Sequence, residues 1–188
     1  MELKDRIMEG AVICFQEKGI KFTMDDLAEK LGMSKKTIYT VVEGKDELLA
    51  EMVEHVFGSI KESEDEVLWS EGISTVEKLR RILGVFPEAY KDINFQGVFE
   101  LREKYPEIYA VVEERLETGW EATIALLEQG MNEGVIRKIN IPIFKMMFEA
   151  SLEQFFQRDI LQRNGIRYQD ALEQVVEIMV DGIVAKEE

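Results

Sequence analysis

Helical spacing of the apolar residues constrains this chain more than any other feature. Leu3, Ile7, Ala11 and Phe15 recur at every fourth position, so they share one face of a helix predicted over residues 3–18. No segment alternates apolar and polar residues as a half-buried strand does. With only 3 prolines in 188 residues, long stretches are free to be helical. The chain is therefore predicted to be all-α.

Two short helices joined by a tight turn are predicted to follow this first helix. Thr23 can cap the first of them, and Gly32 ends it. Ser34 caps the second, which is predicted over residues 35–41 with Ile38 pointing inward. This arrangement is a helix-turn-helix.

The rest of the chain is predicted to form a larger helical bundle. A polar break is expected over residues 61–72, and Ser74 and Glu77 have the spacing of a capping box. The predicted helices cover residues 45–60, 74–90, 94–103, 106–133, 141–163 and 168–186. We expect a helix-turn-helix domain over residues 1–47 and a ligand-binding and dimerisation domain over residues 48–188.

Charge limits how such a chain can meet a polyanion. The net charge is -15, which repels nucleic acid at long range. Residues 1–50 carry 8 basic and 10 acidic side chains, whereas the remainder carries 15 and 28. Any contact with DNA must therefore be local, made by a few lysines and helix amino termini.

The features that the sequence lacks indicate the cellular compartment of the protein and argue against catalytic activity. The single cysteine, Cys14, lies on an apolar helix face, which favours a small buried hydrophobe over a reactive thiol and fits a reducing cytosol. The sequence has no apolar run of membrane-spanning length and no signal-peptide pattern, so we expect a cytoplasmic protein without membrane contact. One histidine, His55, and no nucleophile-base pair or metal-ligand cluster argue against an enzyme and predict no cofactor.

The segment from Gly19 to Leu48 resembles the DNA-binding domain of the TetR family of repressors. The residues that carry the resemblance are Phe15, Gly19, Thr23, Leu27, Ala28, Leu31, Gly32, Ser34, Thr37, Ile38, Tyr39, Lys45, Asp46, Glu47 and Leu48. The resemblance implies a homodimer that binds a palindromic operator in double-stranded DNA, usually as a repressor, and is released by a small-molecule inducer.

The second helix of such a motif enters the major groove. Lys36 suits a guanine edge or a phosphate, Thr37 a base or a phosphate, and the Tyr39 hydroxyl the DNA backbone. Lys45 begins the next helix, where main-chain N–H groups already favour phosphate. By resemblance, Thr23 also binds phosphate. The predicted DNA-binding set is Thr23, Ser34, Lys35, Lys36, Thr37, Tyr39, Thr40 and Lys45.

Other interpretations of these residues stay open at this point. The lysines could be solvated charge, Tyr39 part of the core, and Thr23 only a cap. Val41 and Val42 stand where the family usually has an aromatic or histidine and then phenylalanine, and Gly44 replaces a polar cap. Together with the acidity, these departures motivate a second hypothesis, a helical binding protein that has lost DNA affinity.

Aromatic residues concentrate in the second domain and predict a mostly apolar ligand pocket, although side chains at helical spacing are usually core. The predicted ligand-binding residues are Phe86, Tyr90, Phe99, Tyr109, Trp120 and Phe148. The last two predicted helices carry more apolar surface than one face needs, which favours a symmetric dimer over a monomeric core. The predicted dimer-interface residues are Phe144, Leu152, Phe155, Leu172, Val176, Met179 and Ile183.

Overall fold

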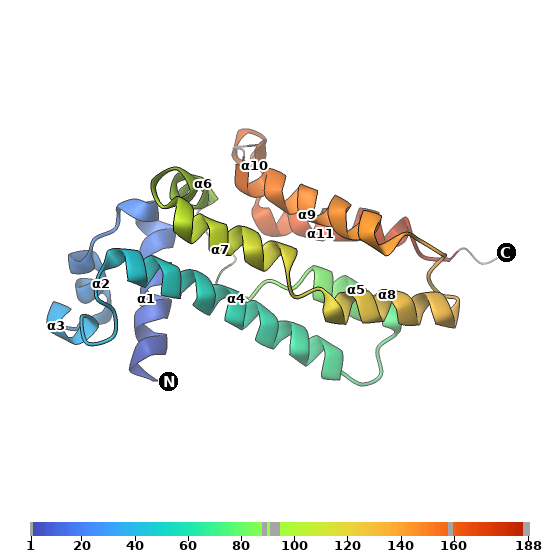
Figure 1. Cartoon of the computed structure of the whole chain (residues 1–188), viewed down its shortest axis with the longest axis horizontal. Coiled ribbons are helices and arrows are strands. Elements are labelled where there is room, and N and C mark those ends of the chain that lie inside the picture. Colours follow the sequence, from blue (N-terminus) through green and yellow to red (C-terminus); the bar gives the residue numbers. More distant parts are fainter. Residues whose placement is uncertain (1, 88–89, 91–94, 158–159, 186–188) are drawn as a thin grey trace. The chain divides into compact units, whose positions relative to one another are not determined.

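The computed structural model describes residues 2–87, 90, 95–157 and 160–185, with the backbone alone for residues 95, 96, 99 and 157. These residues form helices and turns (Figure 1). The one strand-like pairing among them is an isolated antiparallel bridge between Ile136 and Val184. The prediction of an all-α fold is confirmed.

The amino-terminal helices begin where their caps predict. Helix α1 spans Leu3–Lys18, a 3-10 turn η1 spans Gly19–Lys21, and α2 spans Met24–Leu31 with Thr23 as its cap. Helix α3, Lys35–Ile38, is shorter than the predicted 35–41. After Ile38 the backbone tightens, since Thr40 N–H donates to the Thr37 carbonyl at 3.2 Å and Thr40 Oγ1 donates to the same carbonyl at 2.6 Å. This side-chain bond competes with helical continuation.

Helix α4 spans Lys45–Trp69, so the predicted break over residues 61–72 is wrong for most of its length. The segment 61–69 contains good helix formers, and Lys61 pairs with Glu64 one turn later at 3.0 Å. Its polar composition reflects a solvated helix face instead of a loop. The chain turns only after Trp69, where Gly72 has φ 77°.

Two of the later predicted helices are shorter than expected. Ser74 caps α5, Thr75–Leu83, by accepting from Glu77 N–H at 3.2 Å, and the helix ends well before Tyr90. The predicted helix 106–133 is two helices, α7 (Pro106–Glu117) and α8 (Glu121–Glu133). Gly119, with φ 79°, interrupts it, because a left-handed residue cannot continue a right-handed helix.

The remaining helices follow the predicted order. They are α6 (Phe95–Lys104), α9 (Ile141–Gln157), α10 (Ile160–Arg163) and α11 (Tyr168–Asp181). Residues 158 and 159, within the predicted helix 141–163, lie outside the described residues, as does residue 186 at the end of the predicted last helix.

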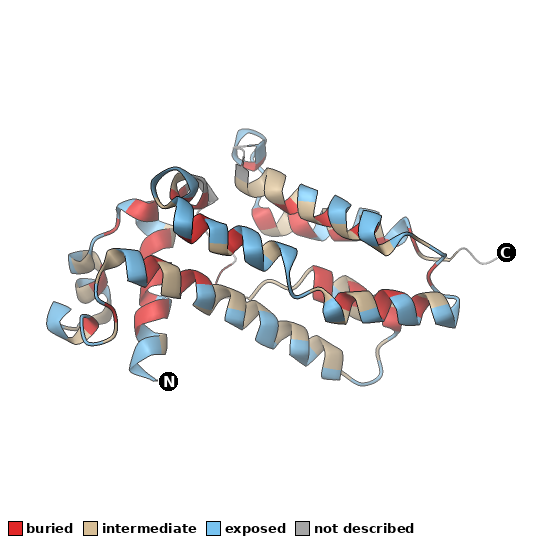
Figure 2. Ribbon diagram, in the orientation of Figure 1, coloured by how far each residue is buried: buried red, intermediate tan, exposed pale blue. Residues whose placement is uncertain are grey.

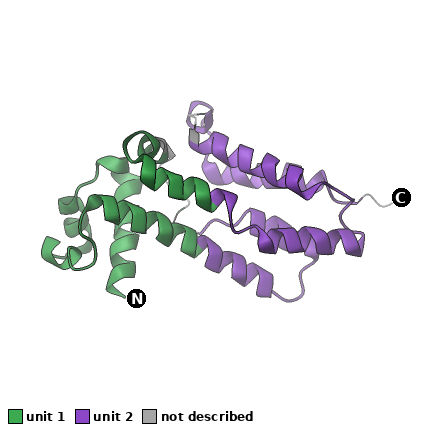
Figure 3. Cartoon of the chain, in the orientation of Figure 1, with its two compact units in different colours: residues 1–59, 88–115 green, residues 60–87, 116–188 purple. Residues whose placement is uncertain are grey.

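The chain divides into two compact units (Figure 3), residues 1–59 with 88–115 and residues 60–87 with 116–188. In the first unit, Leu27, Ile38 and Leu48 are fully buried, and α6 packs on η1. In the second, α5 packs on α8 and α11, and α9 packs on α11. Buried residues line one side of these helices (Figure 2). The predicted division of function at residue 47 stays a prediction.

Glycine substitutions test this packing. A Cβ at Gly130 in α8 would lie 2.8 Å from Cγ1 of Ile136, which is itself buried. Gly130→Ala is therefore expected to destabilise the protein by about 1 to 3 kcal/mol through overpacking. At Gly58 in α4 the same Cβ meets nothing within 4 Å, so Gly58→Ala should stabilise by about 0.4 to 1 kcal/mol. Urea unfolding of both variants measures the contrast, and equal effects would contradict it.

Candidate nucleic-acid interface

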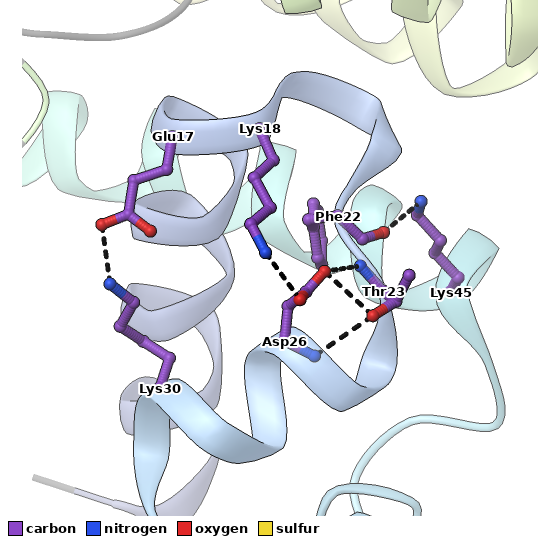
Figure 4. A network of polar contacts seen from close by, with 7 residues as sticks. All are labelled: Glu17, Lys18, Phe22, Thr23, Asp26, Lys30 and Lys45. Carbon is purple, nitrogen blue, oxygen red and sulfur yellow. Dashed lines mark hydrogen bonds and ion pairs between the residues drawn. The ribbon is translucent and has the colours of Figure 1, made fainter.

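The entry to the helix-turn-helix is a capping box between Thr23 and Asp26 (Figure 4). Thr23 Oγ1 accepts from Asp26 N–H at 3.1 Å, while the Asp26 carboxylate accepts from Thr23 N–H at 2.8 Å and from Thr23 Oγ1 at 2.9 Å. Lys18, at the end of α1, pairs with the same carboxylate at 2.7 Å. The bond from Lys18 and those from Thr23 lower the pKa of Asp26 to about 2. The hydroxyl predicted to bind phosphate thus caps α2.

A second ion pair and a close helix contact join α1 to α2. Lys30 lies 2.6 Å from Glu17, and Gly10 leaves room for Leu31, whose Cγ would lie 2.9 Å from a Cβ at that position. Together with Lys18 and Asp26, these contacts hold α2 against α1. Helix α2 therefore provides a fixed support for the turn that follows it.

Helix α3 is held by its cap and by one buried side chain. Ser34 Oγ accepts from Thr37 N–H at 3.1 Å and lies 2.9 Å from Thr37 Oγ1. Gly32 supplies the left-handed turn, with φ 61°. Because Ile38 is fully buried, the opposite side of this short helix must face solvent.

The exposed side of α3 and its following turn presents the residues predicted to read DNA. Lys35, Lys36 and Thr40 are exposed, Thr37 is half-buried, and Tyr39 is 48% exposed. The structure thus brings these five together on one surface, with Ser34 at its start.

The two lysines of α3 differ in their partners. Lys35 lies 2.8 Å from Asp25 of α2, and the hydrogen bond to this carboxylate raises its pKa. A DNA phosphate would have to compete with the Asp25 carboxylate for the Lys35 ammonium. Lys36 makes no hydrogen bond or ion pair with any described residue, so its ammonium is free to meet a base edge or a phosphate.

Lys45 is not free in the same way. Its ammonium donates to the main-chain carbonyls of Ile20 and Phe22, the second at 2.5 Å, and lies 4.9 Å from the centroid of the Phe22 ring. Burial lowers the pKa of Lys45, against the opposing effect of Asp46. Sequence reasoning missed this arrangement because the acceptors lie more than 20 residues away and are backbone atoms that carry no sequence signal.

The residues that depart from the family pattern also have structural explanations. Val42 is 1% exposed and belongs to the core of the first unit, while Val41 is half-buried. Helix α4 begins with Leu48 N–H donating to the Gly44 carbonyl at 3.0 Å. The Glu47 carboxylate accepts from Glu43 N–H, which holds the segment before the helix but does not replace the acceptor that a polar side chain at Gly44 would offer to the first turn.

The predicted ligand-binding residues fall in both units. In the first unit, the Tyr90 hydroxyl lies 3.2 Å from Ser59 Oγ, and Arg102 lies 6.0 Å from the Tyr109 ring. The side chain of Phe99, the third predicted residue there, lies outside the described part of the structure.

The other three predicted ligand-binding residues lie in the second unit. Trp120 meets Phe148 edge-on at 5.6 Å, and Phe86 packs on Tyr168 at 5.1 Å. Phe148 is buried, whereas Phe86 and Trp120 are half-buried. These rings contact other side chains of their own unit.

The helices predicted to dimerise turn most of the chosen residues inward. Among them, Phe155 and Met179 are half-buried, and Phe155 packs edge-on against Tyr168 at 5.9 Å. The others are at most 9% exposed, namely Phe144, Leu152, Leu172, Val176 and Ile183. Residues buried inside one protomer have little surface to offer a second copy.

Different apolar residues on these helices are open to solvent. On α9, Ile143, Met146 and Met147 are 49%, 57% and 54% exposed, and on α11 Ile178 is 71% exposed. A surface groove of about 370 Å³ runs beside them, lined in part by Arg137 and Lys138. We call these four exposed residues the apolar face.

Neither a metal-ligand cluster nor a membrane-spanning helix occurs among the described residues. No group of three histidine, cysteine, aspartate or glutamate side chains is placed to hold a metal ion there. Within the same residues, no helix combines the length and apolar character that crossing a membrane requires.

A capped α2, a glycine turn and a short α3 with an exposed polar face define a helix-turn-helix DNA-binding protein. Residues 7–52 match the model of the tetR family of bacterial regulatory proteins. The amino-terminal part of the chain therefore carries a DNA-binding domain of the tetR type.

Relatives support the same assignment. The chain is 28% identical over 183 residues, which are 97% of this chain and 96% of the other, to an uncharacterised helix-turn-helix transcriptional regulator, YvaF, of Bacillus subtilis. It shares its fold with a TetR regulator of Haloarcula marismortui, with TM-score 0.74, 18% identity and 96% and 97% of the two chains covered. It also shares it with PfmR of Thermus thermophilus, with TM-score 0.61, 22% identity and 97% and 100% covered. The family and these relatives are regulators and not enzymes.

Acid unfolding tests the joint between α1 and α2. The folded pKa of Asp26, about 2, lies below its ordinary value of 3.8, so the unfolded chain binds more protons between these values. The stabilisation from Asp26 is complete above pH 4 and is lost as the pH falls towards 2. Asp26→Asn should therefore weaken the pH dependence of the free energy of unfolding in that window. Asp65→Asn, on the exposed surface of α4, is the control, and an equal response in both variants would contradict the assignment.

Proposed function

We propose that this regulator is a homodimeric repressor that leaves a palindromic operator when a small molecule binds its carboxy-terminal domain. The observation that carries the DNA-binding part is the exposed polar face of α3 opposite the fully buried Ile38. A helix presented in this way fits the major groove with its first residues against base edges.

Within this face, Lys36 and Thr37 are the proposed base-reading residues. Lys36 has no partner among the described residues, and an ammonium is a good donor to guanine O6 and N7. Tyr39 and Thr40 are proposed to contact the DNA backbone from the turn after α3. Lys35 would join them by exchanging Asp25 for a phosphate, an exchange between two anions in exposed surroundings.

Caps serve the interface indirectly. Ser34 holds the first turn of α3 through Thr37, and Thr23 holds that of α2 through Asp26. We propose that both set the angle at which α3 meets DNA, with Thr23 also close to phosphate at the start of α2. The Asp26 carboxylate there is balanced by Lys18.

A homodimer is proposed because one helix-turn-helix contacts only half of an operator. The apolar face on α9 and α11 is suited to symmetric pairing, since burying it in a second copy removes exposed methionine and isoleucine surface from water. Operator binding by such a dimer requires the two α3 helices to lie about 34 Å apart, one turn of DNA.

The ligand is proposed to be an apolar or aromatic compound held among aromatic side chains of the carboxy-terminal domain. The candidate residues that lie together in the second unit are Phe86, Trp120 and Phe148. A change of packing around these rings would be passed along α4, which continues from the first unit into the second. A coupling free energy of about 1 to 3 kcal/mol would be enough for a switch. Such a regulator would work in the cytoplasm.

A gel-shift titration with the DNA that flanks the regulator's own gene tests the base-reading role of Lys36. Lys36→Ala should weaken binding to the preferred site by about 1 to 3 kcal/mol and relax preference at one or two base pairs. Lys61→Ala, which removes a lysine of α4 far along the chain, is the control. Unchanged preference in a site-selection experiment would remove Lys36 from the reading set. No retardation by the wild-type protein at low salt would favour a binding protein without DNA affinity.

Sedimentation tests the dimer. Ile178→Glu should give a folded monomer with weakened operator binding, because it would bury a charge at the contact twice. Ile13→Glu, at a 41% exposed residue of α1, should leave the dimer intact. Circular dichroism checks that both variants remain helical. A wild-type protein that sediments as a monomer at micromolar concentration would rule out the proposed pairing.

A further inference from the structure

Lys45 ends in a site built from the backbone of the preceding turn. The carbonyls of Ile20 and Phe22 both accept from its ammonium, and the ring of Phe22 lies beside it. Carbonyls at the end of a helical turn carry partial negative charge and lack partners within the helix. A cation held by two of them and by an aromatic face satisfies all three groups.

The site connects two parts of the DNA-binding unit that are distant in sequence. Lys45 is the first residue of α4, whereas Ile20 and Phe22 lie in and directly after η1, the turn that leads into α2. Both acceptor residues are buried, with 3% and 0% exposure. The two carbonyls that hold the ammonium therefore have little freedom to move.

Neighbouring contacts make this segment a junction. Helix α6 also packs on η1, and a Cβ at Gly97 of α6 would lie 3.2 Å from the Gly19 Cα. On the other side, Lys4 of α1 pairs with Glu51 of α4 at 2.6 Å. Of these contacts, only Lys45 joins the first turn of α4 to the entry of the helix-turn-helix.

We propose that Lys45 is a positioning residue that ties the start of α4 to the turn before α2, and that it is not a phosphate ligand. The lowering of its pKa by burial agrees with a charge withdrawn from solvent. The tie fixes α2, and with it α3, relative to the helix that continues into the second unit. The contacts of Lys45 exist without DNA. Only their expected effect on operator affinity rests on the proposed function, DNA binding through α3.

The salt dependence of operator binding separates a tie from a phosphate contact. Each phosphate contact adds about 0.9 to the slope of log affinity against log salt. Lys45→Met, which keeps the length of the side chain but not its charge, should weaken binding roughly ten- to hundredfold at every salt concentration and leave the slope unchanged. Lys36→Met is the matched control for a lysine that contacts DNA directly, and it should relax the preference at one or two base pairs.

Stability and rescue give independent results. Lys45→Met should raise the unfolding equilibrium constant roughly ten- to hundredfold, because two buried carbonyls lose a charged donor. Lys36→Met should leave it unchanged. Lys45→Arg should recover most of the stability and affinity, since a guanidinium also donates to carbonyls and stacks on an aromatic ring. A Lys45→Met protein with unchanged stability and a slope lower by about one would overturn the proposal.

A spectroscopic measurement on the wild-type protein does not depend on how the variants fold. Ammonium protons held by carbonyls exchange slowly with water, so protein labelled with ¹⁵N at lysine Nζ should show a resolved Lys45 signal without DNA. Lys45→Arg removes and so assigns this signal. Persistence of the signal in protein that fails to bind DNA would uphold the tie while the proposed function fails. Absence of the signal without DNA and its appearance on adding DNA would overturn the tie.

Discussion

Burial of Ile38 is the constraint on which the DNA-binding surface depends. Helix α3 has only four residues, too few to be stable by hydrogen bonding alone. It is held by one fully buried side chain and by the Ser34 cap. Because Ile38 is fully buried in the first unit, as Leu27 and Leu48 are, the outward direction of Lys36 and Thr37 is decided by packing. The buried side chain of Ile38 thus positions the proposed base-reading residues, although Ile38 itself does not contact DNA.

Polar contacts then set how the supporting helices join. In a chain with net charge -15, four lysines of the first unit are paired with carboxylates, among them Lys18 with Asp26 and Lys35 with Asp25. Lys45 is bound to backbone carbonyls, so it needs no carboxylate. The positive charge left for DNA is therefore small and local, which makes geometry more important than overall electrostatic attraction.

The second unit illustrates how helical register divides apolar residues between two tasks. On α9, Phe144, Phe148 and Leu152 recur every fourth residue and are buried, whereas Ile143 and Met147 lie one position away and are about half exposed. A step of one residue along a helix turns a side chain by about 100°. Apolar composition alone signals that these helices have more than one apolar face, but not which residues belong to each.

The sequence by itself determined the all-α fold, the caps at Thr23 and Ser34 and the glycine turn, since these depend on contacts between residues close in sequence. It also located the exposed residues of α3. Only the tertiary structure decided that α4 continues to Trp69, that five of the seven predicted interface residues are buried, and that Lys45 binds the carbonyls of Ile20 and Phe22. Each of these outcomes depends on a partner distant in sequence or on the side of a helix that packing selects. Backbone acceptors in particular are present at every residue, so no pattern of side chains marks the two that a lysine will reach.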